Sequence, residues 1–258
     1  MNINSKKTIF ITGAASGIGR ATAILFAQKG WFAGLFDIDE KALSDLSKQI
    51  GENNSCFKKT DVSRPEMVKE SVSFFSSHTG GRMDVLFNCA GILRMGYFEE
   101  IEQADQIKEV EVNLKGVINS IYASFNVLKN TQDSRIISMC SASAIYGTPE
   151  LATYSATKFA VRGLTEALNI EFERHDIIVS DILVPYVQTP LLEQERKAAS
   201  IEKLGIDITP EQVADTVWKA AHGKKVHWMM KLTLLRFASW LLPFARKRLV
   251  KAAIWEDK

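Results

Sequence analysis

Thr12-Gly13-Ala14-Ala15-Ser16-Gly17-Ile18-Gly19 joins a short apolar run to a helical pattern, and this octapeptide settles the architecture of the chain. The run Ile9–Ile11 predicts a strand, and Arg20–Lys29 predicts a helix. Glycines between a strand and a helix let the backbone approach a phosphate, while the helix N-terminus supplies N–H groups. The spacing is Gly-x-x-x-Gly-x-Gly and not Gly-x-Gly-x-x-Gly. A tight turn without a ligand is the competing interpretation.

Beyond the octapeptide, short β-rich runs alternate with longer helical patterns. Alternation of this kind implies βαβ units with right-handed crossovers and a parallel sheet. We therefore predict an α/β fold, a Rossmann-like doubly wound parallel sheet flanked by helices, in a single domain over residues 1–258. The further strands are expected at Trp31–Phe36, Ser55–Lys59, Val85–Phe87, Arg135–Met139 and Ile177–Leu183, and helices at Glu40–Leu46, Pro65–Phe75, Gln103–Leu128 and Ala156–Phe172.

Asp37 stands at the predicted end of the second strand, 18 residues after Gly19. A carboxylate at this place can accept hydrogen bonds from both hydroxyls of an adenosine ribose, and it would repel a 2′-phosphate. Ile38 follows it, and no lysine or arginine precedes Gly17 in the loop. The sequence therefore favours NAD over NADP. Alternatively, Asp37 caps the helix expected at Glu40–Leu46.

Tyr154-Ser-Ala-Thr-Lys158 begins a helical pattern, and residues four apart share a helix face. A cation near a phenol favours the phenolate and lowers its pKa, which permits proton exchange nearer neutrality. Ser141 follows a predicted strand and can donate a hydrogen bond to the same substrate oxygen. A bare Tyr-x-x-x-Lys pattern is, however, more typical of a solvated helix face.

Taken together, these motifs resemble the classical short-chain dehydrogenase/reductase family over roughly residues 6 to 221. The family's cofactor motif matches Thr12 to Gly19, and its serine, 13 residues before the tyrosine, matches Ser141. The other matches are Asp61-Val62, the turn Asn88-Cys89-Ala90-Gly91, and Asn113 in Val-Asn-Leu-Lys-Gly.

The resemblance implies a role for each matched position. Tyr154 is the general acid or base, Lys158 lowers its pKa and holds the nicotinamide ribose, Ser141 orients the substrate oxygen, and Asn113 positions a water. Alternatively, Asn113 satisfies backbone groups and Ser141 caps a strand end. Cofactor contacts are implied for Gly13, Ser16, Gly17, Ile18, Gly19, Asp37, Asp61, Val62, Asn88, Ala90, Tyr154, Lys158, Val187 and Thr189.

Composition bears on partners, metal sites, disulfides and location. A net charge of +2 gives no indication of a nucleic-acid partner. The cysteines Cys56, Cys89 and Cys140 have neither metal-ligand spacing nor an even count, so we expect no metal and no disulfide framework. Cys140, beside Ser141, is expected to be a small buried residue and not a reactive thiol. The run Ile9–Ile11 is too short for a signal peptide, and we expect a cytoplasmic protein.

Two C-terminal segments bear on substrate and partners. Residues 190–208 are expected to form the loop over the substrate, with Leu191 and Leu192 facing it. The apolar and basic stretch 231–256, expected to be a helical extension, suits a subunit interface, a cleft cover or a membrane-surface helix. The resemblance favours a homodimer or homotetramer formed through the helices near Gln103–Leu128 and Ala156–Phe172.

The sequence thus predicts an NAD-dependent oxidoreductase that interconverts a secondary alcohol and a ketone. An apolar substrate is indicated by Leu191, Leu192 and the candidate lining residues Met95, Tyr97, Ile145 and Tyr146. A non-catalytic, nucleotide-binding redox sensor of the same fold is the alternative. An epimerase or dehydratase related to the extended dehydrogenases is disfavoured by the glycine spacing.

Overall fold

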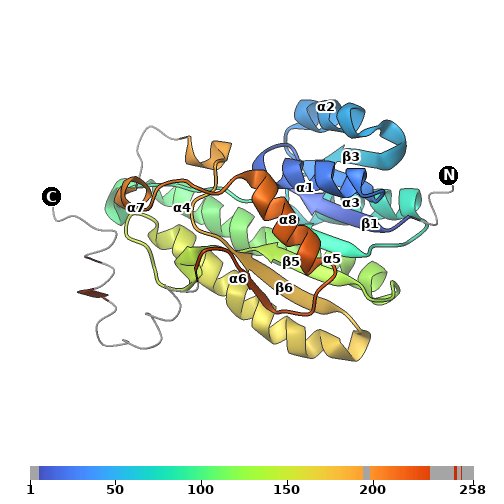
Figure 1. Cartoon of the computed structure of the whole chain (residues 1–258). Helices are drawn as coiled ribbons and strands as arrows, with labels where there is room; N and C mark the ends of the chain where they lie inside the picture. Colours follow the sequence, from blue (N-terminus) through green and yellow to red (C-terminus); the bar gives the residue numbers. More distant parts are fainter. Residues whose placement is uncertain (1–5, 194–197, 233–246, 249–250, 252–258) are drawn as a thin grey trace.

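A parallel sheet forms the centre of the molecule (Figure 1). The computed structural model describes residues 6–193, 198–232, 247–248 and 251. Within them, seven strands pair in parallel in the order β3-β2-β1-β4-β5-β6-β7, which confirms the predicted doubly wound sheet. The strands are β1 (Thr8–Thr12), β2 (Phe32–Asp37), β3 (Ser55–Lys59), β4 (Val85–Asn88), β5 (Arg135–Met139), β6 (Ile178–Leu183) and β7 (His227–Met229).

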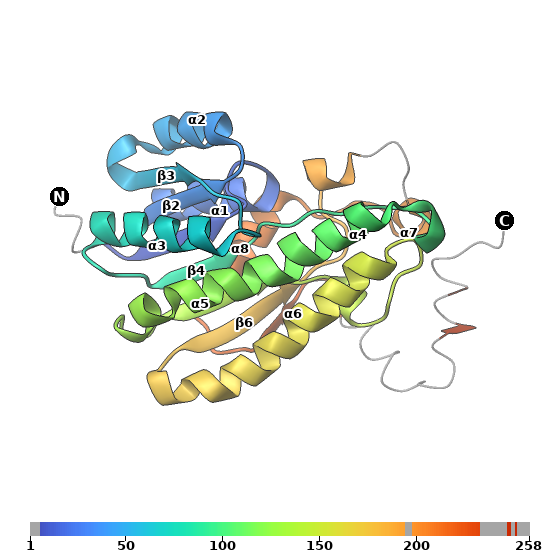
Figure 2. The ribbon, with the colours of Figure 1, turned by 180° about the vertical axis from the view of Figure 1, so that it is seen from behind.

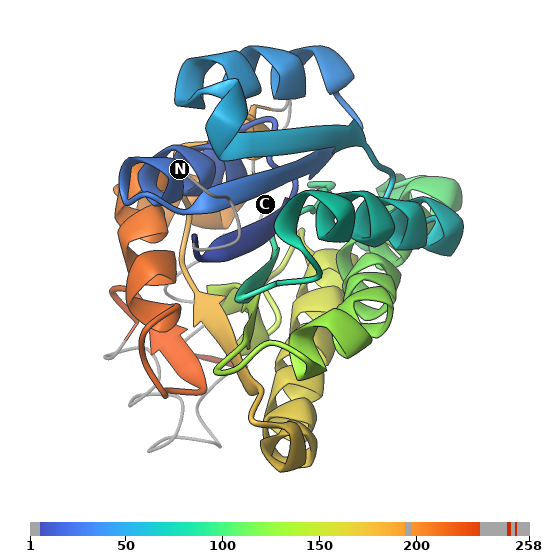
Figure 3. The same ribbon diagram turned by 90° about the vertical axis from the view of Figure 1, so that its right-hand side faces the viewer.

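Helices cover both faces of the sheet (Figures 1, 2 and 3). One face carries α1 (Gly17–Gln28), α2 (Glu40–Ile50) and α8 (Pro210–Ala220). The other carries α3 (Pro65–Thr79), α4 (Gln103–Val110), α5 (Gly116–Lys129) and α6 (Ala152–Glu171). A short helix, α7 (Ala199–Leu204), lies in the segment that follows β6.

Side chains that alternate along the strands fill two separate cores. Ile9 and Ile11 of β1 belong to the cluster under α1 and α8, while Phe10 between them belongs to the cluster under α3 and α5. Phe10 stacks on Phe36 of β2, with ring centroids 3.9 Å apart. Both faces of β1, β2 and β4 are buried, which explains why these strands are short and mostly apolar runs.

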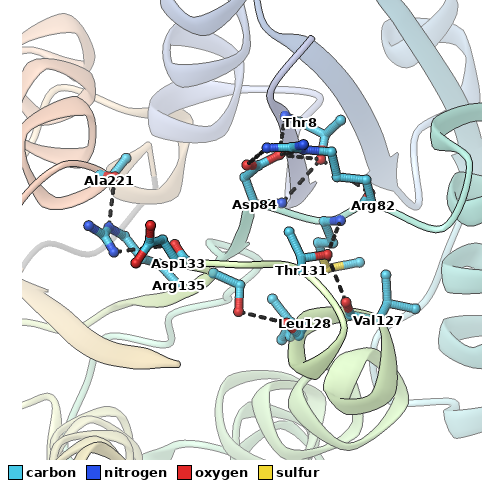
Figure 4. A network of polar contacts seen from close by, with 11 residues as sticks. Thr8, Arg82, Asp84, Val127, Leu128, Thr131, Asp133, Arg135 and Ala221 are labelled. Atoms are coloured by element: carbon cyan, nitrogen blue, oxygen red, sulfur yellow. Dashed lines mark hydrogen bonds and ion pairs between the residues drawn. The ribbon is translucent and has the colours of Figure 1, made fainter. Parts of the chain in front are cut away.

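The amino ends of the strands are fastened by a polar network far from the site (Figure 4). Asp84, just before β4, accepts hydrogen bonds from the backbone N–H of Thr8 at 2.9 Å and from Nε of Arg82 at 2.7 Å. Arg135 at the start of β5 donates from Nε to the carbonyl of Ala221 after α8 at 2.8 Å. These bonds hold together the segments at the amino ends of the strands. Functional residues of such sheets lie at the opposite, carboxyl ends.

Several elements differ from the sequence-based expectation; α7 and α8 were not predicted, and α6 begins at Ala152 instead of Ala156. The first helix begins at Gly17, three residues before Arg20, so the last glycines lie in its first turn. The helix expected at Gln103–Leu128 is interrupted by a π-helical segment, Glu111–Lys115. Strand β7 was not predicted because its His-Trp-Met sequence is short; His227 fastens it to β6 by contacting Asp181 Oδ1 at 2.9 Å.

The expected C-terminal extension lies almost entirely outside the described residues. Leu232, at its start, is buried against Leu183 and Cys140. Among the described helices, none has both the length and the apolar character needed to cross a bilayer.

Candidate active site

Two adjoining hollows lie at the carboxyl ends of the strands. The larger, of about 910 Å³, runs from the octapeptide past Asp37 and Asp61 to the loop after β4. The smaller, of about 100 Å³, is lined by Ser141, Tyr154 and Lys158. Five residues, Ile18, Cys89, Gly91, Thr189 and Leu191, line both hollows. Residues from distant parts of the chain therefore meet in one continuous cleft.

The octapeptide lines the larger hollow with Gly13, Ser16, Gly17 and Ile18, and close backbone packing leaves no room for side chains at Gly13 and Gly19. Gly13 has φ +69°, and a Cβ on it would lie 2.7 Å from Cα of Ala90. A Cβ on Gly19 would lie 2.0 Å from the carbonyl oxygen of Gly13. Ser16 precedes α1 and makes no side-chain capping bond, so its hydroxyl is not used by the helix. The helix N-terminus faces the hollow as an anion site.

Asp37 ends β2 at the edge of the larger hollow. Its Oδ2 accepts a hydrogen bond from the backbone N–H of Ala15 at 3.1 Å, and its Oδ1 accepts one from Asp39 at 3.2 Å. The N-cap of α2 is Asp39, whose Oδ1 accepts from the N–H of Ala42 at 3.0 Å. The capping interpretation of Asp37 is therefore wrong, and its carboxylate faces the hollow beside the glycine loop.

The loop after β3 supplies Asp61 and Val62 to the lining of the same hollow. Asp61 Oδ1 accepts hydrogen bonds from Ser63, from its N–H at 3.0 Å and from its hydroxyl at 2.7 Å. Val62 packs so closely on Gly116 that a Cβ there would lie 2.6 Å from a Val62 methyl group. This packing places the loop at the start of α5.

The turn after β4 is held by Thr12 and Asn88. The Thr12 hydroxyl accepts hydrogen bonds from the N–H groups of Cys89 at 3.1 Å and Ala90 at 3.2 Å. Asn88 is buried and donates from Nδ2 to Ser138 on the neighbouring strand at 3.2 Å. Ala90 lines the larger hollow, whereas Asn88 lines neither of the two. The geometry of Asn88 is that of a group that steadies the sheet.

Asn113 lies in the middle of the π-helical segment and is fully buried. Its Oδ1 accepts from the N–H of Ile92 at 2.8 Å, and its Nδ2 donates to the carbonyl of Ile92 at 2.8 Å. Nδ2 also lies 3.5 Å from the Thr157 hydroxyl, one residue before Lys158. Asn113 therefore ties the loop after β4 to the helix that bears the tyrosine and lysine.

Tyr154 and Lys158 lie one turn apart near the start of α6. The ammonium of Lys158 is 5.4 Å from the centroid of the Tyr154 ring and donates to the carbonyl of Met139 at 2.9 Å. Ser141, two residues after Met139, lines the same hollow from the end of β5. The predicted phenol, ammonium and hydroxyl thus converge.

Ser141 also organises its own loop. Its Oγ accepts from the N–H of Ser143 at 3.2 Å and donates to the Ser143 hydroxyl at 3.2 Å. That hydroxyl also accepts from Thr148 at 3.3 Å. Ser141 thus caps the short 3-10 helix Ala142–Ala144 and not the end of the strand, and the same residue lines the smaller hollow beside Tyr154.

Burial dominates the electrostatics of this pair. It raises the pKa of the Tyr154 phenol above its ordinary value, although a hydrogen bond to Ser141 acts in the opposite direction. It also lowers the pKa of Lys158. The lowered phenol pKa expected from the sequence is therefore wrong for the chain by itself, because desolvation by burial is the largest influence on the pKa of Tyr154.

The segment after β6 closes the site. Val187 is buried, pairs with Ile208 through a β-bridge and lines the smaller hollow. Thr189 lines both hollows and packs against Gly17, where a Cβ would lie 3.0 Å from its methyl group. Both residues lie where the family motif predicts cofactor contacts.

The smaller hollow has an apolar wall. It includes the expected Leu191 and Leu192 together with Leu93, Leu151 and Tyr186, which were not predicted. The expected lining residues Met95, Tyr97, Ile145 and Tyr146 line neither of the two hollows. Met95 instead packs in the buried cluster behind Leu93. Tyr186 lies three residues after the end of β6, and that position could have revealed it.

Cys140 is buried as expected. It is 2% exposed, and burial raises the pKa of its thiol to about 12, so it is neutral and unreactive near neutrality.

A family model described as short chain dehydrogenase matches residues 7–200. The chain belongs to the short-chain dehydrogenase family. It is therefore an oxidoreductase, and Tyr154, Lys158 and Ser141 lie within the matched residues.

Several curated proteins resemble this short-chain dehydrogenase along most of its length. Oxidoreductase UcpA from Salmonella typhimurium is 32% identical over 216 residues, 83% of this chain and 80% of that protein. The 3-oxoacyl-[acyl-carrier-protein] reductase FabG from Thermotoga maritima is 33% identical over 221 residues, 82% and 88% of the two chains. The 3-ketodihydrosphingosine reductase of Mus musculus is 32% identical, covering 83% of this chain and 68% of that protein.

Solved structures agree with the fold. A short-chain dehydrogenase/reductase from Brucella melitensis, named glucose/ribitol dehydrogenase, superposes with a TM-score of 0.79 at 27% identity, covering 87% of this chain and 94% of its own. A 3-ketoacyl-(acyl-carrier-protein) reductase from the same organism, complexed with NADH, gives a TM-score of 0.79 at 26% identity, with 88% and 97% covered.

Proposed function

We propose that this dehydrogenase interconverts a secondary alcohol and a ketone, using NAD(H) and Tyr154 as general acid or base. The observation that carries the proposal is the convergence of Ser141, Tyr154 and Lys158 in a hollow that adjoins the glycine-lined cavity. The cavity fits an extended dinucleotide, since Gly13 and Gly17 line it without side chains and a carboxylate stands at Asp37.

In the proposed reaction the substrate oxygen lies between Ser141 and Tyr154. When bound, the nicotinamide ring accepts or supplies the hydride. The Ser141 hydroxyl donates a hydrogen bond to the substrate oxygen, and Tyr154 takes the alcohol proton in oxidation and returns it in reduction. Lys158, one helical turn away, supplies the positive charge that favours the phenolate once the site is filled.

Other residues of the cleft hold the cofactor. The N–H groups at the start of α1 and the Ser16 hydroxyl would bind the pyrophosphate, and Asp37 would accept from the adenosine ribose. Asp61 and Val62, which line the larger hollow, would border the adenine, while Val187 and Thr189, which line the smaller one, would border the nicotinamide. NAD is preferred to NADP because the Asp37 carboxylate would repel a 2′-phosphate. The NADH-bound reductase from Brucella melitensis supports a nicotinamide cofactor.

The substrate is proposed to be rather apolar. Leu93, Leu151, Leu191 and Leu192 line the hollow in which Ser141 and Tyr154 meet. Burial of hydrocarbon surface against such side chains is favourable by about 25 cal/mol for each Å² removed from water. Names of relatives such as 3-ketodihydrosphingosine reductase and FabG agree with chain-bearing ketones.

A homo-oligomer is proposed through the outer faces of α5 and α6 (Figure 2). Ile118 and Tyr122 on α5 and Phe159 and Ile170 on α6 are exposed, and Tyr122 is 85% exposed. Large apolar side chains gathered on adjacent helices are typical of subunit contacts. The three cysteines are free, which suits the reducing cytoplasm as the proposed location.

A substrate panel tests the proposed function. Medium-chain and long-chain secondary alcohols and ketones would be assayed with NAD(H) and NADP(H) side by side, with small polyols and sugars as polar controls. The proposal expects the highest kcat/KM for apolar substrates with NAD(H). Turnover confined to sugars, or an NADP(H) preference, contradicts the substrate or the cofactor proposal respectively.

A further inference from the structure

Glu109 is a buried acid near the site that the proposed reaction does not use. It lies on α4 and is 1% exposed. Its Oε1 accepts a hydrogen bond from the backbone N–H of Arg94 at 2.7 Å. The guanidinium of Arg94 contacts a different carboxylate, that of Asp105, at 3.3 Å. Within the described part of the chain, no cation lies within ion-pair distance of Glu109. A buried carboxylate without a contacting cation requires an explanation.

Glu109 lies on a helix that packs against α6, which carries Tyr154 and Lys158. It precedes Asn113 by four residues, and such residues share a helix face. Asn113 faces α6, because its Nδ2 lies 3.5 Å from the Thr157 hydroxyl. Helices α4 and α6 are packed together (Figure 2). Glu109 therefore lies on the side of α4 from which its charge acts on both Lys158 and Tyr154.

Lys158 lacks a contacting anion as well. Its Nζ donates to a neutral group, the Met139 carbonyl, and no described carboxylate lies within ion-pair distance of it. The acidic groups that act on its charge are Cys140, Cys89 and Glu109. Burial raises the pKa of both thiols to about 12, so neither carries charge near neutrality. Glu109 remains as the source of negative charge.

We propose that Glu109 is a positioning residue whose carboxylate balances the buried ammonium of Lys158 from the neighbouring helix. The contribution of this charge to turnover rests on the proposed function, whereas the pairing of the two charges does not. Opposite charges stabilise each other across a buried gap more strongly than in water, because little solvent screens them. Loss of the carboxylate should therefore make Lys158 easier to deprotonate.

The pairing depends on pH. The charged groups that act on Glu109 are Arg94, Asp105 and Lys158, and burial raises its own pKa to about 7. The carboxylate therefore ionises as the pH rises through neutrality. It is fully charged in the alkaline range, where a desolvated lysine would otherwise lose its proton.

Lysine NMR of the cofactor-free chain provides the test. Protein labelled with ¹³C at lysine Cε would be titrated, and the Lys158 signal assigned by its absence in Lys158→Arg. In Glu109→Gln, which keeps an acceptor for Arg94, the Lys158 midpoint should fall by about half a pH unit or more. Glu109→Asp should retain most of the wild-type midpoint. An unchanged midpoint in Glu109→Gln overturns the proposal.

A control variant and a measurement on the wild type support this test. Glu102→Gln removes an exposed carboxylate at the start of the same helix and should leave the Lys158 midpoint unchanged; an equal fall there overturns the proposal. Should Glu109→Gln not fold, the wild-type Lys158 signal alone must show an inflection near pH 7 as Glu109 ionises, and its absence is equally decisive.

The alkaline limb of kcat/KM completes the comparison. It should move to lower pH in Glu109→Gln, in parallel with the Lys158 midpoint; an alkaline limb that stays in place while the midpoint falls contradicts a contribution to turnover. A wild-type chain that oxidises no alcohol but shows the shifted midpoint refutes the proposed function and leaves the charge pairing intact.

Discussion

The Asp37 carboxylate accepts a hydrogen bond from the backbone N–H of Ala15 at 3.1 Å, so the end of β2 and the glycine loop hold each other in place. This contact holds the negative charge of Asp37 at the edge of the larger hollow, where the proposed function has it accept from an adenosine ribose. The same side chain therefore shapes the loop and, in the proposed function, selects the cofactor.

Replacement of Asp37 by serine should shift cofactor preference. Loss of a charged hydrogen-bond acceptor should lower kcat/KM for NAD by about 10- to 100-fold, and the value for NADP should rise. Steady-state kinetics with both cofactors measure the ratio. Asp39→Asn is the matched control, because Asp39 caps α2 and should leave the ratio unchanged. An unaltered ratio in the Asp37 variant contradicts the ribose role.

Gly13→Ala should abolish dinucleotide binding. The new Cβ would lie 2.7 Å from the backbone of Ala90 at a φ of +69°, so the turn after β4 must move. The cost should be about 1–3 kcal/mol of stability, together with loss of NADH fluorescence enhancement. Gly147→Ala serves as the control, since no atom lies within 4 Å of a Cβ there. NADH affinity equal to that of the wild type would refute the assigned role of the loop.

Glu109→Gln should change how stability depends on pH. Burial raises the Glu109 pKa to about 7, so the folded chain binds this proton more tightly than the unfolded chain. The stability that this tighter proton binding adds is fully present below the pKa of about 4.5 that Glu109 has in the unfolded chain. It is lost as the pH rises to about 7. The free energy of unfolding of the glutamine variant, relative to that of the wild type, should therefore be about 1–3 kcal/mol higher above pH 7 than below pH 4.5.

Urea unfolding at several pH values measures that difference. The free energy of unfolding of the variant, relative to the wild type, should rise between about pH 4.5 and about pH 7 and then level off. A difference that is constant over this interval would show that Glu109 titrates normally.

Tyr122→Glu should weaken self-association. The side chain is 85% exposed on α5, and a charge there opposes burial in a subunit contact. Light scattering coupled to gel filtration should give a smaller mass than for the wild type, while Tyr122→Phe should keep the wild-type mass. An assembly that tolerates the glutamate must use another face.

Local patterns made much of the fold and site predictable. The octapeptide fixes a strand, a turn and a helix within a few residues, and the spacing of Tyr154 and Lys158 fixes a shared helix face. Ser141 was predictable because the carboxyl ends of parallel strands meet at one edge of the sheet.

Features that depend on contacts between distant segments were not predictable. The π-helical segment around Asn113 has the same apolar spacing as an ordinary helix, and its hydrogen bonds to Ile92 come from another part of the chain. Glu109 reads as one more polar residue of α4, and only packing shows that it is buried. Likewise, desolvation of Tyr154 is a property of the assembled site, which is why the direction of its pKa was misjudged.

Tyr154→Phe tests the central claim most directly. The phenylalanine fills nearly the same space but has no proton to exchange, so kcat should fall by about 100-fold or more while NADH still binds with wild-type affinity. Ketone reduction and NADH fluorescence titration on the same preparation supply both values. Turnover at the wild-type rate would contradict the account and favour a nucleotide-binding sensor.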